Sequence, residues 1–219
     1  MKSLISSILL ICTTFFVFAN NSQVSPKWNK YSVSQTIYTS DLNSKKLLHG
    51  KSKTAFENNI ADFYLYKNGQ LVKPPKDSIR SFFIAGCLCF KFDDTLLLNS
   101  GLGRTAGIGV GIKIYKDKFT GSLHGNAGSN LAYKFKKTDT AYLRDINVQP
   151  LTQSLKFIKQ PDFAPDEVII GEYNATYKKF YQRVHHKDES RNYTVRLLFK
   201  CKITGMDSMK DPTGSDAKQ

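Results

Sequence analysis

Five glycines cluster in residues 101–111, and a glycine-rich segment of this kind can bind phosphate. They are Gly101, Gly103, Gly107, Gly109 and Gly111, with Arg104 among them. A P-loop ends in Lys-Ser/Thr, and a dinucleotide site needs a helix after its glycines. Neither is present, because residues 112–115 continue as a strand-like Ile-Lys-Ile-Tyr. The glycines therefore indicate either a close approach of neighbouring elements or a ligand cavity inside a barrel, lined by Gly107, Gly109 and Gly111.

Other residues with catalytic or metal-binding chemistry do not form a recognisable pattern. His185-His186 precedes Asp188 and Glu189, but adjacent histidines on an extended chain point to opposite sides. A tetrahedral metal site needs further ligands that this segment lacks. The chain has no Gly-x-Ser-x-Gly elbow and no His-Glu-x-x-His motif. We therefore predict a non-catalytic protein without metal or cofactor; an enzyme with a site assembled from distant strands is the alternative.

The first 19 residues have the pattern of a secretory signal peptide. Lys2 is followed by a largely apolar run over residues 4–18, and Val17-Phe18-Ala19 suits a cleavage site. Cleavage after Ala19 predicts a secreted or periplasmic protein. An uncleaved anchor is disfavoured because a spanning helix needs about 20 apolar residues. Lipidation at Cys12 is disfavoured because the preceding residue, Ile11, is large.

Three cysteines, Cys87, Cys89 and Cys201, follow the predicted signal peptide. Export would place them in an oxidising compartment. Cys87 and Cys89 are two residues apart in a strand-like run, a poor arrangement for bonding to each other. These positions allow a disulfide from Cys87 or Cys89 to Cys201, which would close a loop of over 100 residues. The alternative is three buried thiols that pack as small hydrophobic groups.

The chain is strongly basic, with 32 Lys+Arg against 18 Asp+Glu and a formal charge of +14. Nucleic acid is a poor partner for an exported protein, whereas anionic lipid head groups or polysaccharide fit the charge. We predict a basic patch at Lys178, Arg196, Lys200 and Lys202, where Lys178 faces Arg196 if the last hairpin turns near residue 187. The alternative is that the charge serves solubility.

The hydrophobic pattern predicts an all-β fold. Apolar residues (41%) and aromatic residues (12%) are too frequent for a disordered chain. Alternation with period two recurs between Gly, Pro, Asn and Asp turns, and Asn68-Gly69 predicts a tight hairpin. We expect about nine or ten strands in one antiparallel domain over residues 20–204, then a disordered tail over 205–219. Either a closed up-and-down barrel or a two-sheet sandwich fits this count.

The barrel alternative is similar in architecture to lipocalin-type, or calycin-like, barrels. The Gly-x-Trp opening of lipocalins is missing, since the single tryptophan, Trp28, follows Lys27. The resemblance implies that the glycine-lined strand and an aromatic face of Tyr173, Tyr177 and Tyr181 bind a small apolar or amphipathic ligand. The alternative function is a cell-envelope module that holds anionic lipid or polysaccharide on its basic face. No second apolar run reaches spanning length, and the oligomeric state is left open.

Overall fold

The computed structural model describes residues 26–36, 58–72, 86–103 and 107–205. The predicted signal peptide and residues 206–219 of the predicted tail lie outside these ranges. The described residues form an all-β structure without helices, which confirms the predicted class. Among them there is accordingly no helix that is long and apolar enough to cross a membrane.

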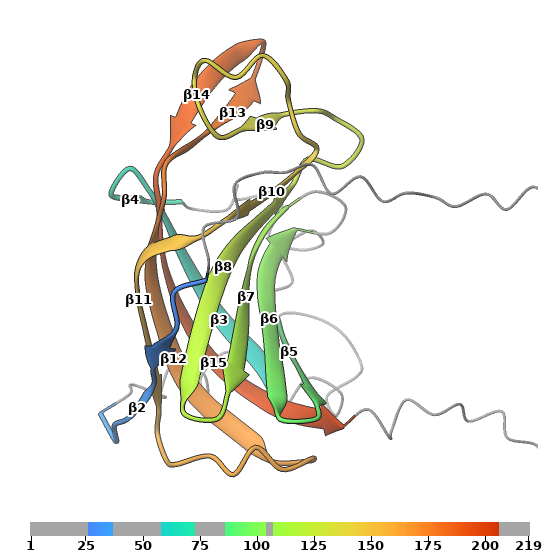
Figure 1. The fold of residues 1–219 in the computed structure, drawn as a ribbon. Coiled ribbons are helices and arrows are strands. Elements are labelled where there is room, and N and C mark those ends of the chain that lie inside the picture. The colour runs from blue at the N-terminus through green and yellow to red at the C-terminus, as the bar shows by residue number, and fades with distance from the viewer. Residues whose placement is uncertain (1–25, 37–57, 73–85, 104–106, 206–219) are drawn as a thin grey trace, which may run out of the picture.

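The strands within the described ranges form a large sheet and a small sheet (Figure 1). In chain order they are β1 (Asn29–Lys30), β2 (Ser32–Val33), β3 (Asn59–Lys67), β4 (Gln70–Leu71), β5 (Gly86–Phe92), β6 (Thr95–Gly103), β7 (Gly107–Tyr115), β8 (Lys118–Asn126), β9 (Tyr133–Lys134), β10 (Asp145–Val148), β11 (Pro150–Phe157), β12 (Val168–Tyr177), β13 (Phe180–Val184), β14 (Lys187–Arg191) and β15 (Tyr193–Gly205).

The large sheet follows the order β1-β8-β7-β6-β5-β3-β15-β12-β11-β2, with β10 paired to β8 and β4 paired to β3. It is mixed, because β2 pairs with β11 in parallel and β5 pairs with β15 in parallel. The prediction of a purely antiparallel fold is therefore wrong at these two pairings. The sheet curls so that β5–β8 lie opposite β3, β15, β12 and β11 (Figure 1). Strands β10 and β11, separated by Gln149 alone, pair with β8 and β12 respectively and so connect the two halves.

Local turn chemistry explains the long hairpins. Asn68 and Gly69 both have positive φ, 50° and 82°, which is the geometry of a tight primed turn. This confirms the predicted hairpin, in which Lys67 pairs with Gln70. Asp93 (φ 49°) and Lys116 (φ 54°) begin the turns of the β5–β6 and β7–β8 hairpins.

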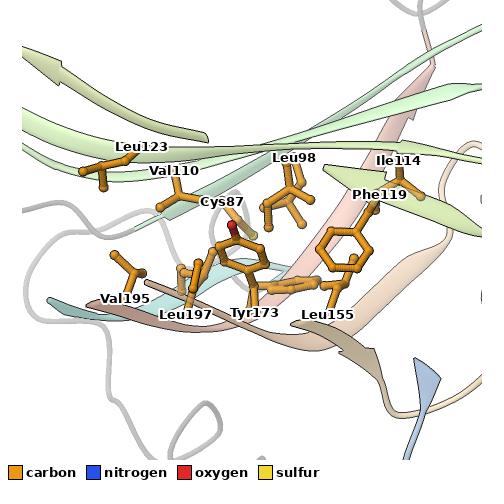
Figure 2. Close-up of a cluster of buried hydrophobic side chains, with 14 of the residues drawn as sticks. Cys87, Leu98, Val110, Ile114, Phe119, Leu123, Leu155, Tyr173, Val195 and Leu197 are labelled. Carbon is orange, nitrogen blue, oxygen red and sulfur yellow. The ribbon is translucent and has the colours of Figure 1, made fainter. Parts of the chain in front are cut away.

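The core lies between the two halves of the curled sheet (Figure 2). One half contributes Cys87, Leu98, Val110, Ile114, Phe119 and Leu123, and the other contributes Leu155, Tyr173, Val195 and Leu197. Tyr173 is fully buried and contacts the edge of the Phe119 ring at a centroid distance of 6.2 Å. Its hydroxyl reaches Gly121 on β8, where an added Cβ would lie 2.0 Å from the Tyr173 oxygen. The tyrosine thus spans the interior and occupies the space above a glycine.

The small sheet, with order β14-β13-β9, extends from one end of the large sheet (Figure 1). The chain leaves β12 at Tyr177, forms the β13–β14 hairpin and returns as β15. His185 and His186 form the exposed turn of that hairpin. In the register of β12 with β15, Asn174 pairs with Arg196. Lys178 lies beyond the end of β12, so the conditional prediction that it faces Arg196 is wrong.

Candidate functional site

The three glycines of β7 face outward. Val110, Ile112 and Ile114 alternate with them and are each 1% exposed in the core. Because successive strand residues point to opposite sides, Gly109 and Gly111 lie on the other face of β7, with Gly107. We call the outward residues of β5–β8 the outer glycine face. The predicted placement of the glycines inside a barrel is thereby corrected.

Polar side chains of β6 and β8 meet above β7 at the centre of the outer glycine face. In the register, Gly111 pairs with Asn99 on one side and with Ser122 on the other. A Cβ on Gly111 would lie 2.7 Å from Nε2 of His124 and 3.1 Å from Oδ1 of Asn99. His124 Nε2 is also hydrogen-bonded to Ser122 Oγ at 2.9 Å. The missing side chain therefore allows three hydrogen-bonding groups to converge over one strand.

The cluster above Gly111 is uncharged at neutral pH. The side chain of His124 keeps an exposed edge, but the surrounding strands desolvate its ring and lower the pKa of His124 below 6.5. Neutral imidazole, amide and hydroxyl groups donate and accept hydrogen bonds. These groups are suited to a ligand rich in hydroxyl or amide groups.

The other half of the outer glycine face is apolar and basic. Leu88, Tyr115 and Phe92 are exposed by 55%, 39% and 36%, and the ring of Phe90 packs beside Phe92. Lys113 pairs with Leu97 in the same row of the sheet and is exposed. None of the described outward residues of these four strands is a carboxylate. Exposed apolar patches of this kind often mark interaction sites.

The predicted aromatic face does not come together as a ligand site. Tyr173 and Tyr177 are fully buried, and their hydroxyl oxygens are hydrogen-bonded at 3.1 Å. Burial raises the pKa of both tyrosines. Tyr181 lies apart from them on β13, with Lys179 Nζ 5.3 Å from its ring centroid. Two of the three tyrosines therefore belong to the core.

The predicted basic patch is partly neutralised by carboxylates. Arg196 Nε donates to Glu172 at 2.8 Å, and Lys202 Nζ lies 2.7 Å from Asp166. Lys200 is half-buried, and its carbonyl oxygen accepts a hydrogen bond from Cys87. Two of the four predicted cations, Arg196 and Lys202, are therefore paired with carboxylates.

The sequence analysis did not identify a charged cluster in the small sheet. Lys134 on β9 is only 5% exposed and lies 2.7 Å from Asp188 on β14. The Tyr142 hydroxyl donates to the same carboxylate at 2.7 Å, and the Arg183 guanidinium stacks 3.7 Å from the Tyr142 ring centroid. These residues are far apart in the chain, so no sequence spacing signals them. Their contacts hold the loop before β10 against the β13–β14 hairpin.

We expect Asp188→Asn to reduce the loss of stability in acid. Hydrogen bonds from Lys134 and Tyr142 lower the pKa of Asp188 in the folded state. A depressed folded-state pKa contributes stability above the unfolded pKa of about 3.9 and loses it as pH falls through the folded value. The melting temperature of the wild type should therefore fall more steeply than that of the variant, between roughly pH 5 and pH 3.

The control is Asp94→Asn in the exposed β5–β6 turn, which should retain the wild-type slope. Thermal unfolding followed by circular dichroism, at pH steps of half a unit, gives the dependence of the melting temperature on pH for each variant and for the wild type. Parallel curves for the wild type and Asp188→Asn would contradict this role of the carboxylate.

Comparisons with known proteins assign no family. No protein-family model, curated protein or solved structure matches the chain. Within the described ranges, no group of three or more His, Cys, Asp or Glu side chains is placed to hold a metal ion.

Proposed function

We propose that the protein is an exported, non-catalytic interaction module that binds an anionic polysaccharide on the outer glycine face. The observation that carries the proposal is that a polar surface and an apolar, basic surface lie side by side on one face of the sheet. A polar cluster of Asn99, Ser122 and His124 converges over Gly111, and exposed apolar side chains lie beside Lys113.

Each part of this face matches a chemical feature of a polysaccharide. Sugar rings present C–H faces that pack on exposed rings such as Phe92 and Tyr115, and ligand sites combine such apolar contacts with a few polar groups. Sugar hydroxyls both donate and accept hydrogen bonds, as do the groups over Gly111. The Lys113 ammonium would pair with a carboxylate or sulfate of the polymer. Rows of the sheet run across four strands, so the face can contact several consecutive sugars.

A polysaccharide fits this surface better than a lipid bilayer. Insertion into a bilayer would remove water from the exposed Asn99 side chain without supplying hydrogen-bond partners, which is costly. Asp93 and Asp94 are exposed at the tip of the β5–β6 hairpin, where they would repel the anionic groups of either partner. The carboxylates lie at the rim of the face, whereas its centre is free of them.

The proposed protein is exported through a signal peptide at residues 1–19, and β10 and β11 close its curled sheet in the manner of a barrel. Binding on the outer glycine face replaces binding of a ligand in the interior as the proposed function. The interior of the described core is occupied by large side chains, with Tyr173 reaching across it (Figure 2). The glycines remain ligand-binding candidates because Gly109 and Gly111 form the floor of the outer glycine face.

We expect the purified protein to bind polygalacturonate but not neutral dextran, as measured by affinity electrophoresis and calorimetry. Lys113→Glu and Phe92→Ala should each raise the dissociation constant about tenfold, equivalent to 1.4 kcal/mol. Binding should weaken with added salt, because exposed charges are screened. The matched controls are Lys137→Glu and Leu151→Ala, which change exposed residues elsewhere and should bind like the wild type.

Two results would overturn this function. Binding to phosphatidylglycerol vesicles without binding to polygalacturonate would assign the face to lipid. The second is a small molecule that co-purifies reproducibly, as detected by native mass spectrometry, with a protein that does not bind polysaccharide. This result would support the binding of a ligand in the interior.

A further inference from the structure

One short segment near the N-terminus forms both ends of the large sheet. Strand β1 pairs with β8 at one end of the strand order, and β2 pairs with β11 at the other (Figure 1). Only Tyr31 separates β1 from β2. We call residues 27–33 the N-terminal strap. The strap therefore bridges β8 and β11.

The strap lies where β8 and the β10–β11 segment part from each other. Residues 145–148 of β10 pair with β8, but after Gln149 the chain continues as β11, which pairs with β12 instead. The other end of β8, at residues 118 and 119, pairs with the strap. On its far side the strap pairs with Lys156 and Phe157 of β11. We call this place between β8 and β11 the seam.

The side chain of Gln153 on β11 connects all three parts of the seam. Its Oε1 accepts a hydrogen bond from the backbone N–H of Gly121 on β8 at 2.8 Å. Its Nε2 donates to the carbonyl oxygen of Lys27 at 2.7 Å and to Oδ1 of Asn29 at 3.0 Å. A glutamine amide has two N–H donors, and the strap accepts from both. Gln153 thus recognises the backbone and a side chain of the strap.

Tyr31 is the main anchor of the strap. Its ring packs edge-on against Phe157 and Phe163, at centroid distances of 5.2 Å and 5.9 Å. Its hydroxyl accepts a hydrogen bond from Nε2 of Gln160 at 2.9 Å. Extended peptides are commonly recognised in this way, by strand pairing together with a pocket for one side chain. An aromatic residue in such a pocket carries much of the binding energy.

The rest of the strap is loosely attached. Each of its residues is exposed or half-buried, and β1 and β2 are only two residues long. The Lys30–Asp117 ion pair joins two exposed side chains, and such pairs contribute little to stability. Segments with few buried contacts open locally while the core stays folded. Without the strap, β8 keeps its pairing with β7, and β11 keeps its pairing with β12.

We propose that the seam is a binding site for an extended peptide strand, which the N-terminal strap of a second copy of this chain fills by strand exchange. The strap of another copy offers the same tyrosine, amide and backbone groups, so the exchanged pair needs no new contact. Residues 37–57, outside the described ranges, join the strap to the next described strand. At roughly 3.4 Å per residue they reach up to about 70 Å, which allows the strap to cross to a neighbouring copy.

A fluorescent peptide of residues 26–34 tests the seam in the full chain. The Tyr31→Ala protein keeps the seam but weakens its own strap. Since apparent affinity scales with the fraction of sites that are open, this variant should bind the peptide about tenfold more tightly than the wild type, as measured by anisotropy. Peptides carrying Tyr31→Ala or Asn29→Ala should bind this protein about tenfold more weakly. The control peptide, Ser32→Ala, changes an exposed side chain and should bind like the original.

Exchange between copies is tested by mixing the Tyr31→Ala protein, which has an open seam, with the Gln153→Ala protein, which has a freed strap. We expect a heterodimer in sedimentation velocity, whereas each variant alone and the wild type stay monomeric at the same concentration. If Tyr31→Ala does not fold, Lys30→Glu weakens the strap through the exposed pair with Asp117.

Two outcomes would overturn the proposal. Equal peptide binding by the wild type and the strap-weakened variant would show that the strap does not occupy the peptide site. Peptide binding without a heterodimer would exclude a second copy as the partner. Both measurements are independent of polysaccharide binding.

Discussion

Replacing Gly121 with alanine is expected to lower the free energy of unfolding by about 3 kcal/mol. The new Cβ would lie 2.0 Å from the Tyr173 hydroxyl oxygen and 2.6 Å from the ring carbon that bears it. Tyr173 cannot move away freely, because it is fully buried and its hydroxyl is hydrogen-bonded to the hydroxyl of Tyr177. Chemical denaturation measures the change, with a fall in melting temperature of about 10 °C as a second readout.

A matched glycine substitution and a compensating change test the cause. At Gly86 an added Cβ would meet its nearest atom at 3.6 Å, which is ordinary contact, so Gly86→Ala should change stability by less than about 0.5 kcal/mol. Tyr173→Phe removes the nearest clashing atom and should recover part of the loss in the double variant. Equal effects at Gly121 and Gly86, or strictly additive effects in the double variant, would show that the clash is not the cause.

We expect Phe199→Ala to lower the free energy of unfolding by about 4 kcal/mol. Phe199 is fully buried, and its ring contacts the edge of Phe157 at a centroid distance of 6.1 Å. It pairs with Gly171 on β12, where an added Cβ would lie 2.6 Å from the Phe199 ring. Alanine would leave a cavity that the backbone of paired strands cannot collapse to fill.

The control is Phe92→Ala on the outer glycine face. Its ring is 36% exposed, so its truncation should cost less than about 1 kcal/mol. Equilibrium unfolding in urea of both variants gives the comparison. This difference also separates stability from function, because Phe92→Ala is expected to impair polysaccharide binding while the protein stays folded. Similar losses of stability in the two variants would contradict the assignment of Phe199 to the core and Phe92 to the surface.

Parts of the fold and of the candidate site follow from local sequence. The Asn68-Gly69 turn is a local choice of backbone conformation, and the structure confirms the hairpin around it. The β7–β8 hairpin also follows from alternation on either side of the turn at Lys116. The small sheet was not predicted, because its strands β9 and β13 come from distant parts of the chain.

The sequence by itself determined the all-β class, the hairpin turns and the existence of alternating faces, because these depend on neighbouring residues. Tertiary structure alone decided which face points inward. Alternation places Gly109 and Gly111 on one face and Val110 on the other, but only burial against β12 and β15 shows that the glycines lie outside. The Lys134–Asp188 ion pair also depends on tertiary structure, because it needs β9 to pair with β13, which is distant in the chain. Such register is set by the packing of the whole core, so no local pattern encodes it.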